Sequence, residues 1–411
     1  MKKLLKLVLL LPLLYSATQA RGMNFHSKKA LGKALYSDKS LSKNRKMSCA
    51  TCHHKKRAFI DIRKSSIGHM AGFSADKQFI GDRNVPTASY SAQIPPFHSV
   101  IKDGEKVYIG GQFLDGRAKD LKEQAKGPFL NPIEMQMPSK EAVIERVKEN
   151  RRYRKAFKRI YGRDIFSDID ASYDALADAI ASFEKSRVFS PFNSRYDKFL
   201  KGRKRLSKQE LRGLALFSDT TRANCVACHP ISGNRPLLTN FKYNNLGVPI
   251  NDELRALNGK GETFIDHGLL DNPNVDDVKF DGAFRVSTLR NIAETAPYMH
   301  NGIFKELKTV VHFYNTRDVE GAINPETGQP WRDAEVPATV NHTHMGDLGL
   351  SDAEEDDIVA FLKTLTDKRY QNRRAYTHNP ADIFNNFFKF ITTNHMSYKF
   401  NGFVCNTTPR D

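Results

Sequence analysis

A five-residue pattern that occurs twice constrains this chain more than any other feature. Cys-x-x-Cys-His stands at residues 49–53 and again at residues 225–229. Two thiols on one turn can add to the two vinyl groups of a haem, and the histidine that follows then lies beneath the iron. Zinc binding or a disulfide pair is the alternative, but two copies in one chain disfavour both. The sequence therefore predicts two covalently bound c-type haems.

An internal repeat precedes the two patterns. Residues 31–38 and residues 212–219 share Gly, Ala, Leu, an aromatic residue, Ser and Asp in the same order. Each copy has helical character and ends shortly before a Cys-x-x-Cys-His unit. This repetition indicates one haem module used twice. A boundary is expected near residues 185–205, where a Ser-Pro pair and a basic polar run interrupt the helical pattern.

The helical period dominates the chain. Apolar residues recur at three- and four-residue spacings in residues 143–160, 173–183 and 358–365. Ser207 and Ser351 each begin a capping box, which is the signature of a helix start. Convincing alternating strands are few. We therefore expect an all-α fold.

The helical segments and the two haem patterns predict a domain plan. Residues 21–190 are expected to form an N-terminal and residues 191–370 a C-terminal cytochrome c-like haem domain, followed by an extension at residues 371–411. Long loops rich in Gly, Pro and Asn are expected at residues 64–135 and 230–305. Loops of this length are typical of functional segments, so we expect them to be ordered and to build the sites.

The first twenty residues have the pattern of a secretory signal peptide. Lysines flank and enter an apolar run at residues 4–14, and the small residues Thr18 and Ala20 occupy the usual cleavage positions. A membrane anchor is the alternative, but the run is shorter than the roughly 20 residues that a span needs. We expect cleavage after Ala20 and export to a bacterial periplasm.

The chain is strongly basic, with a formal net charge of +18. Such a charge suggests an acidic partner, an anionic membrane surface or nucleic acid. Export argues against nucleic acid, and no nucleic-acid module is recognisable. Because the lysines and arginines are scattered through helical stretches, a solvated basic surface is favoured over a dedicated patch.

The C-terminal extension has an apolar cluster and the fifth cysteine. Ile383, Phe384, Phe387 and Phe388 fall at helical spacing, so one face is expected to dock on the body of the protein rather than on a partner. Cys405 lies in the same extension, and the sequence leaves open whether it is a free thiol or an intermolecular link.

The second axial ligand of each iron decides between electron transfer and catalysis. His53 and His229 are the expected proximal ligands, and a five-coordinate iron can do chemistry whereas a six-coordinate iron passes electrons. Met299 is the candidate sixth ligand of the second haem, because a thioether favours ferrous iron and raises its potential. His300 is an alternative ligand, and core packing is the role that physics alone favours for a lone methionine.

Several further motifs, in the same order along the chain, resemble bacterial di-haem cytochrome c peroxidases. They are Asp-Gly-Arg-Ala at 115–118, Glu-Gln-Ala-Lys-Gly-Pro at 123–128, Asn-Pro-Ile-Glu-Met at 131–135, Asn-Leu-Gly-Val-Pro at 245–249, Leu-Arg-Asn at 289–291, Ala-Pro-Tyr-Met-His at 296–300 and Met-Gly-Asp-Leu-Gly-Leu at 345–350. The similarity runs from about residue 25 to about residue 370. It implies a low-potential peroxidatic haem on His53 and a high-potential electron store held by His229 and Met299.

The resemblance also implies two catalytic side chains near the first haem. Gln124 and Glu134 match the distal glutamine and glutamate of that family. As the O–O bond of peroxide breaks, one oxygen must lose a proton and the other must gain one. A carboxylate can move that proton and an amide can orient the substrate. Pairing with one of the many lysines is the alternative role of Glu134.

Further metal ligands are implied in the same way. His69 resembles the histidine that closes the peroxidatic iron in the oxidised resting state and leaves when the second haem is reduced; a solvated loop histidine is the alternative. Asn84 matches the side-chain ligand of a structural calcium ion, with backbone carbonyls near Phe280 and Gly282 supplying the rest. A turn residue before Val85 is the alternative role of Asn84.

One position departs from that family. Its members usually have a tryptophan between the haems, two residues after the position of Gln112; here Leu114 stands there, and Trp331 is the only tryptophan of the sequence. An aromatic ring can carry a hole between two irons and leucine cannot. Electron tunnelling through protein can still connect two nearby haems, but Leu114 argues against long-range oxidation by hopping.

Three functions compete. The leading one is reduction of hydrogen peroxide to water with electrons from a small c-type cytochrome or copper protein. The second is oxidation of residues on a partner protein, as MauG-type enzymes do; Met299 and Leu114 argue against it, because those enzymes carry a tyrosine ligand and use the bridging tryptophan. The third is a non-enzymatic electron carrier with two permanently six-coordinate haems. A homodimer is compatible with each of the three.

Overall fold

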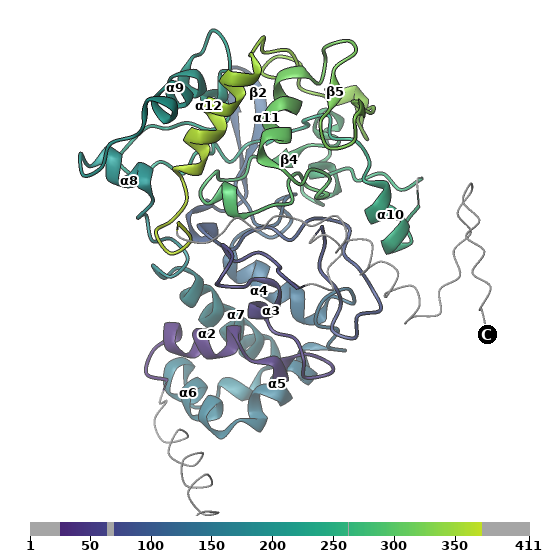
Figure 1. Cartoon of the computed structure of the whole chain (residues 1–411). Coiled ribbons are helices and arrows are strands. Elements are labelled where there is room, and N and C mark those ends of the chain that lie inside the picture. The colour runs from purple at the N-terminus through teal and green to yellow at the C-terminus, as the bar shows by residue number, and fades with distance from the viewer. Residues whose placement is uncertain (1–24, 64–69, 262, 372–411) are drawn as a thin grey trace, which may run out of the picture.

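The computed structural model describes residues 25–63, 70–261 and 263–371 of the 411-residue chain (Figure 1). The expected signal peptide, His69, the C-terminal apolar cluster and Cys405 lie outside the described residues. Within these ranges, no helix combines the length and the apolar character that crossing a membrane requires.

Helices make up most of the regular structure. The N-terminal half contains α2 (Lys28–Tyr36), α3 (Cys49–Cys52), α4 (Leu121–Leu130), α5 (Lys140–Glu149), α6 (Arg151–Tyr161) and α7 (Ile169–Glu184). The C-terminal half contains α8 (Arg195–Leu200), α9 (Lys208–Ser218), α10 (Asp252–Asn258), α11 (Leu307–Thr316) and α12 (Asp352–Lys363). The fold is therefore rich in helix, as the apolar periodicity predicts.

The strands are short and form antiparallel pairs. In the described ranges β1 (His98–Lys102) pairs with β2 (Glu105–Ile109), β3 (Tyr243–Asn244) with β4 (Phe284–Arg285), and β5 (Ile323–Asn324) with β6 (Gln329–Pro330). These pairs join loops to each other and form no extended sheet.

Each half has a hydrophobic core of its own. The first core gathers residues from α2, α4, α5, α6 and α7, including Leu31, Phe129 and Leu176. The second gathers residues from α9, α11 and α12, including Phe217 and Phe361. Figure 1 shows α2 and α7 together in the lower half and α9 and α12 together in the upper half.

The internal repeat places one glycine in each half at a helix crossing. A Cβ atom on Gly32 would lie 1.7 Å from the carbonyl oxygen of Ala179, where α2 crosses α7. A Cβ atom on Gly213 would lie 1.8 Å from the carbonyl oxygen of Asp357, where α9 crosses α12. Only glycine permits this approach. The repeated sequence therefore builds the same helix crossing twice.

Local signals set the helix ends as predicted. Ser207 and Ser351 form capping boxes at the starts of α9 and α12, and their hydroxyls accept the backbone N–H groups of Glu210 and Glu354. Ser27 caps α2 in the corresponding place by accepting the N–H of Ala30. Helix starts are thus well specified by short sequence patterns.

The two expected loops hold more regular structure than predicted. Residues 64–135 include the β1–β2 hairpin and all of α4, and residues 230–305 include α10 and the β3–β4 pair. Gly127 and Pro128 in α4 read as loop signals in the sequence. The helix nevertheless forms, because Asp120 caps it and its buried residues Leu121, Ala125 and Phe129 share one face.

Candidate haem sites

The first Cys-x-x-Cys-His unit forms a single helical turn followed by its histidine. Cys49 and Cys52 begin and end α3, and neither is in a disulfide. The Nδ1 atom of His53 lies 3.1 Å from the carbonyl oxygen of Phe59. Burial lowers the pKa of His53. The ring is therefore neutral with Nδ1–H donating to Phe59, which leaves Nε2 as a metal ligand.

In the second unit, too, a backbone carbonyl orients the histidine through its Nδ1 atom. Cys225 begins the 3₁₀ turn Cys225–Ala227, and the Nδ1 atom of His229 lies 2.7 Å from the carbonyl oxygen of Leu238. Burial lowers the pKa of His229 to about 4, so this ring is neutral at physiological pH.

The two carbonyl groups that orient the histidines share an unusual backbone conformation. Phe59 has a φ of 57° and Leu238 a φ of 52°, in the left-handed region that bulky residues seldom adopt. The cost is of order 1–3 kcal/mol and persists only where surrounding structure fixes it. In both halves, therefore, the residue whose carbonyl orients the histidine has a strained backbone conformation.

A cavity of about 300 Å³ lies beside the second unit. Cys225, Cys228 and His229 line it. Met299, Tyr314 and Met345 line it as well, and most of the remaining lining is apolar. Two thiols, a neutral imidazole and a thioether facing one apolar cavity fit a covalently bound haem. Ligation of the iron by Met299 itself stays a prediction.

His300 lines the same cavity and also contacts Phe284 and Glu335. Its ring stacks on Phe284, with centroids 3.9 Å apart, and its Nε2 lies 3.7 Å from a carboxylate oxygen of Glu335. Met299 precedes it in the left-handed region, with a φ of 69°. Both candidates line the cavity of the second unit, and ligation of the iron by either stays a prediction.

Glu134 lies close to the first unit. Burial raises the pKa of the Cys49 and Cys52 thiols, and the negative charge of Glu134 adds to both rises. The Asn131 side-chain amide donates to the Glu134 carboxylate at 2.8 Å. Burial also raises the pKa of Glu134, against the opposing effects of Asn131 and the positive charge of Arg117. Glu134 is thus a carboxylate that can hold a proton near the first haem-binding unit.

Gln124 is a half-buried residue of α4, next to the buried Ala125. Within the described residues, its side chain has no hydrogen bond to Glu134 or to the first unit. Its role as a distal amide stays a prediction.

Asn84 connects the N-terminal half to the loop that carries Met299. Its side-chain amide donates to the Pro297 carbonyl at 2.7 Å, and its backbone N–H donates to the His300 carbonyl at 2.6 Å. The carbonyl of Phe280 accepts the N–H of Ala283, and a Cβ on Gly282 would meet Val336 and Asn245. Asn84 thus contacts the carbonyls of Pro297 and His300, and the calcium site with Phe280 and Gly282 stays a prediction.

Comparison with known proteins places this geometry in a family. A model of the di-haem cytochrome c peroxidase family matches residues 26–205. The methylamine utilization protein MauG of Paracoccus denitrificans is 42% identical over 373 residues, which span 89% of this chain and 95% of that protein. The chain belongs to the di-haem cytochrome c peroxidase family. It is therefore a haem-containing oxidoreductase of a di-haem family, and attachment of the two haem c groups at the two units stays a prediction.

Other members of the family are similar along most of their length. The cytochrome c551 peroxidase of Pseudomonas aeruginosa is 30% identical over 389 residues, covering 90% of this chain and 87% of that protein. The solved structure of the diheme peroxidase BthA from Burkholderia thailandensis covers 85% of this chain and 88% of its own, with a TM-score of 0.77 and 32% identity. The similar members thus include both peroxidases and MauG.

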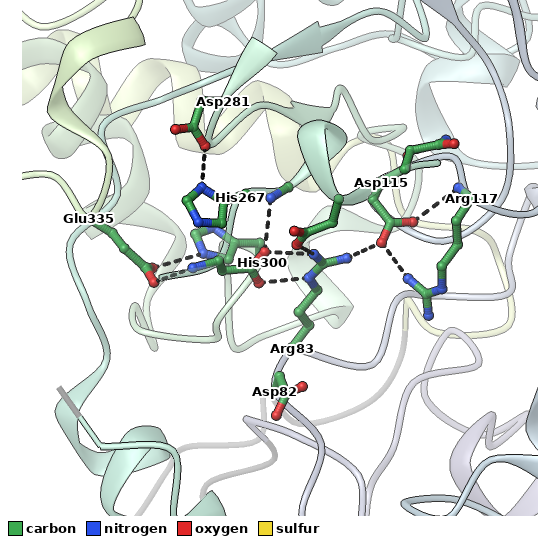
Figure 2. Close-up of polar contacts among 12 residues, drawn as sticks. Asp82, Arg83, Asp115, Arg117, His267, Asp281, His300 and Glu335 are labelled. Carbon is green, nitrogen blue, oxygen red and sulfur yellow. Dashed lines mark hydrogen bonds and ion pairs between the residues drawn. The ribbon is translucent and has the colours of Figure 1, made fainter. Parts of the chain in front are cut away.

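An ion-pair network between the two halves was missed by the sequence reasoning. Arg83 pairs with Asp115 of its own half and, through two bonds of 2.6 and 2.7 Å, with Asp266 of the other half (Figure 2). Burial alone would raise the pKa of Asp266, but the Arg83 pair lowers it to about 2. The pair also raises the pKa of Arg83. An ion-pair cluster thus joins the halves of this di-haem peroxidase-family chain.

Buried charges extend this network toward the Met299 loop. Arg255 donates to Glu335 at 2.5 Å, and the same carboxylate oxygen accepts the backbone N–H of Asp266 at 2.8 Å. Figure 2 shows Glu335 beside His300. The only sequence signal for this network was the Asp-Gly-Arg motif at 115–117, because Arg83 and Asp266 are 183 residues apart.

Proposed function

We propose that this chain reduces hydrogen peroxide to water at the His53 haem, with electrons that a small c-type cytochrome or copper protein supplies through the His229 haem. One observation carries the proposal: the buried, protonatable carboxylate Glu134 lies beside the first unit, whereas Met299 lines the cavity of the second. A proton-transfer group beside one haem and a thioether beside the other support a division between chemistry and electron storage.

Glu134 performs the proton transfer in this proposal. A haem held by Cys49, Cys52 and His53 would supply an iron at which peroxide can bind and electrons can be exchanged one at a time. Glu134 takes the proton from one peroxide oxygen and delivers it to the other, which leaves as water. Asn131 holds the carboxylate with a 2.8 Å hydrogen bond, so the group needs no reorientation between the two transfers. Gln124 would orient the peroxide, and His69 would close the iron in the oxidised resting state.

Several secondary features belong to the same proposal. Residues 1–20 would direct export to the periplasm, where the donor is found. The two hydrophobic cores would correspond to N- and C-terminal haem domains. A calcium ion at Asn84 would fix the Met299 loop, because Asn84 already holds that loop through Pro297 and His300.

Oxidation of a partner protein is the second candidate, because MauG of Paracoccus denitrificans is 42% identical to this chain. Two residues weigh against it. Met299 stands where we expect a tyrosine ligand in such enzymes, and Leu114 lines the second cavity where a tryptophan is expected. Trp331 does not replace it, because its ring packs against Phe304 and Phe313 in the second core and its Nε1–H donates to Thr316.

Donor oxidation by the purified di-haem protein tests the proposal. Reduced cytochrome c or a reduced copper protein is mixed with the enzyme after partial reduction, and its oxidation is followed optically on addition of hydrogen peroxide. The proposal predicts oxidation of two donor molecules for each peroxide. Absence of peroxide-dependent oxidation with both donors, even after prereduction, would contradict it.

A further inference from the structure

Tyr90 occupies a place between the two haem sites. Its buried side chain lines the cavity that contains His229 and Met299. Its backbone N–H donates to the carbonyl of Phe189, and the Phe189 ring stacks on Phe59 with centroids 4.3 Å apart. Phe59 is the residue whose carbonyl orients His53. Tyr90 therefore faces the second haem site and is connected through one stacked pair of rings to the first.

The hydroxyl of Tyr90 is directed at a buried carboxylate. It lies 2.9 and 3.1 Å from the two carboxylate oxygens of Asp367. The backbone N–H of Phe192 donates to the Tyr90 oxygen at 3.1 Å, so the phenolic hydrogen is left to point at Asp367. The side-chain amide of Asn291 donates to the same carboxylate at 2.9 Å. The partners of Asp367 are donors, so its carboxylate accepts these hydrogen bonds, and burial raises the pKa of Asp367.

This hydrogen bond matters because a buried phenol cannot easily lose an electron alone. Removal of an electron without a proton would leave an uncompensated positive charge in the interior, which is costly. Burial and the charge of Asp367 raise the pKa of Tyr90, so the group is a neutral phenol at physiological pH. A carboxylate at 2.9 Å can take the proton as the electron leaves, and neither the ring nor the backbone has to move.

We propose that Tyr90 is a redox-active residue of this enzyme, which gives an electron to the oxidised His53 centre while its phenolic proton passes to Asp367. The inference rests on the proposed peroxide reduction. Hydrogen peroxide, two electrons and two protons give two waters, and Tyr90 supplies one of those electrons when the second haem has none to give. The O–H bond of Tyr90 breaks and an O–H bond forms on Asp367. An electron from the donor, arriving through the second haem, and the proton on Asp367 then restore the phenol.

Three other tyrosines each share only one of the two features of Tyr90, which are a place in the cavity lining and a hydrogen bond to a carboxylate. Tyr153 and Tyr161 also donate to carboxylates, of Asp38 at 2.8 Å and Asp178 at 2.9 Å, but they belong to the first core and do not line the second cavity. Tyr298 lines the cavity, but it donates to a backbone carbonyl, which cannot take up a proton. Only the position of Tyr90 combines the cavity with a carboxylate among these four.

Freeze-quenched electron paramagnetic resonance of the di-haem protein tests the inference. The protein with its second haem reduced, in which the proposed function leaves the His53 iron open, is reacted with hydrogen peroxide without further donor. A tyrosyl radical signal, narrowed by ring-deuterated tyrosine, is expected in the wild type. Tyr90→Phe keeps the ring and its packing and should remove the signal. Asp367→Asn keeps the phenol and should lower its yield at least tenfold. Tyr153→Phe and Tyr298→Phe are the matched controls and should retain it.

The outcomes separate this inference from the proposed function. A radical of unchanged yield in Tyr90→Phe, with haem spectra like those of the wild type, overturns the role of Tyr90. Wild-type protein that oxidises donor with peroxide but forms no tyrosyl radical also overturns it and leaves peroxide reduction intact. Wild-type protein that neither consumes peroxide nor oxidises donor removes both.

Discussion

The two haem-binding units are alike on the histidine side and different on the opposite side. In both, a glycine lets the first helix cross the last at backbone contact, and a carbonyl in the left-handed region orients the histidine. On the opposite side the first unit has Glu134 nearby and the second has Met299 in its cavity. The comparison teaches that the scaffold was repeated while the distal residues diverged, so the chemistry of each haem is decided by the loops.

Replacement of the proton-transfer group beside the first haem should have the largest effect on activity. Glu134→Gln removes the carboxylate but keeps its size and the contact with Asn131. We expect peroxide-dependent donor oxidation to fall about 10²–10⁴-fold, the usual contribution of a general acid–base group. Steady-state kinetics measure this, and the reduction potential of the second haem should not change. Glu123→Gln, an exposed glutamate on α4, is the control and should keep wild-type activity.

Removal of the cation that joins the halves should have the next largest effect. Arg83→Ala leaves Asp266 buried without its counter-charge, whereas Asp115 keeps its pair with Arg117. Breaking a buried pair costs about 3–5 kcal/mol. Chemical denaturation measures the loss. Arg222→Ala is the control, because its pair with Glu354 is exposed and worth at most about 1 kcal/mol.

The same network predicts a pH dependence. The folded-state pKa of Asp266 is about 2, below its unfolded value, so its contribution to stability is complete above the unfolded pKa and is lost as pH falls through about 2. The difference in stability between wild type and Arg83→Ala should therefore shrink between about pH 5 and pH 2. A difference that stays constant over this window would contradict the pairing.

Replacement of either repeated glycine should destabilise the protein to a similar extent, because both lie at the helix crossing that the two halves share. Gly32→Ala and Gly213→Ala each place a methyl group against a carbonyl oxygen, and overpacking of this kind costs about 1–3 kcal/mol. Each variant should lower the stability of the protein by a similar amount in thermal unfolding followed by circular dichroism. Gly162→Ala is not a suitable control, because Gly162 has a φ of 109°. Glu145→Ala, at an exposed position of α5, is the control and should leave the stability nearly unchanged. A large effect at one glycine and none at the other would refute the equivalence of the two crossings.

The smallest expected effect concerns the helix caps that precede the two units. Ser27 and Ser207 cap α2 and α9 through one backbone N–H each. Their replacement by alanine should cost about 1 kcal/mol in each half, measured by denaturant unfolding. Ser207→Ala should cost slightly more, because Glu210 completes a capping box only at α9.

The features that could be predicted from the sequence depend on residues that are close together in the chain. The capping boxes, the helical faces and the repeated glycine depend on residues a few positions apart, and each appears in the structure where it was expected. Helix α4 was missed because Gly127 and Pro128 read as loop signals, whereas burial of Leu121 and Phe129 stabilises it. Tertiary packing overrides such weak propensities.

What could not be predicted depends on distant partners. Arg83 and Asp266 are 183 residues apart, and Tyr90 and Asp367 are 277 residues apart. No spacing pattern connects them, because they meet only after the halves pack together. Resemblance to the family identified Glu134 and Asn84 by their motifs, but the carbonyl partners of Asn84 needed the fold.

The central claim is that the two haems are unequal, and carbon monoxide binding to the fully reduced protein tests it most directly. An optical titration should show that one of the two haems binds carbon monoxide. In Met299→Ala the second haem should bind it as well. Binding of carbon monoxide by both haems of the wild type, or by neither, would contradict the account.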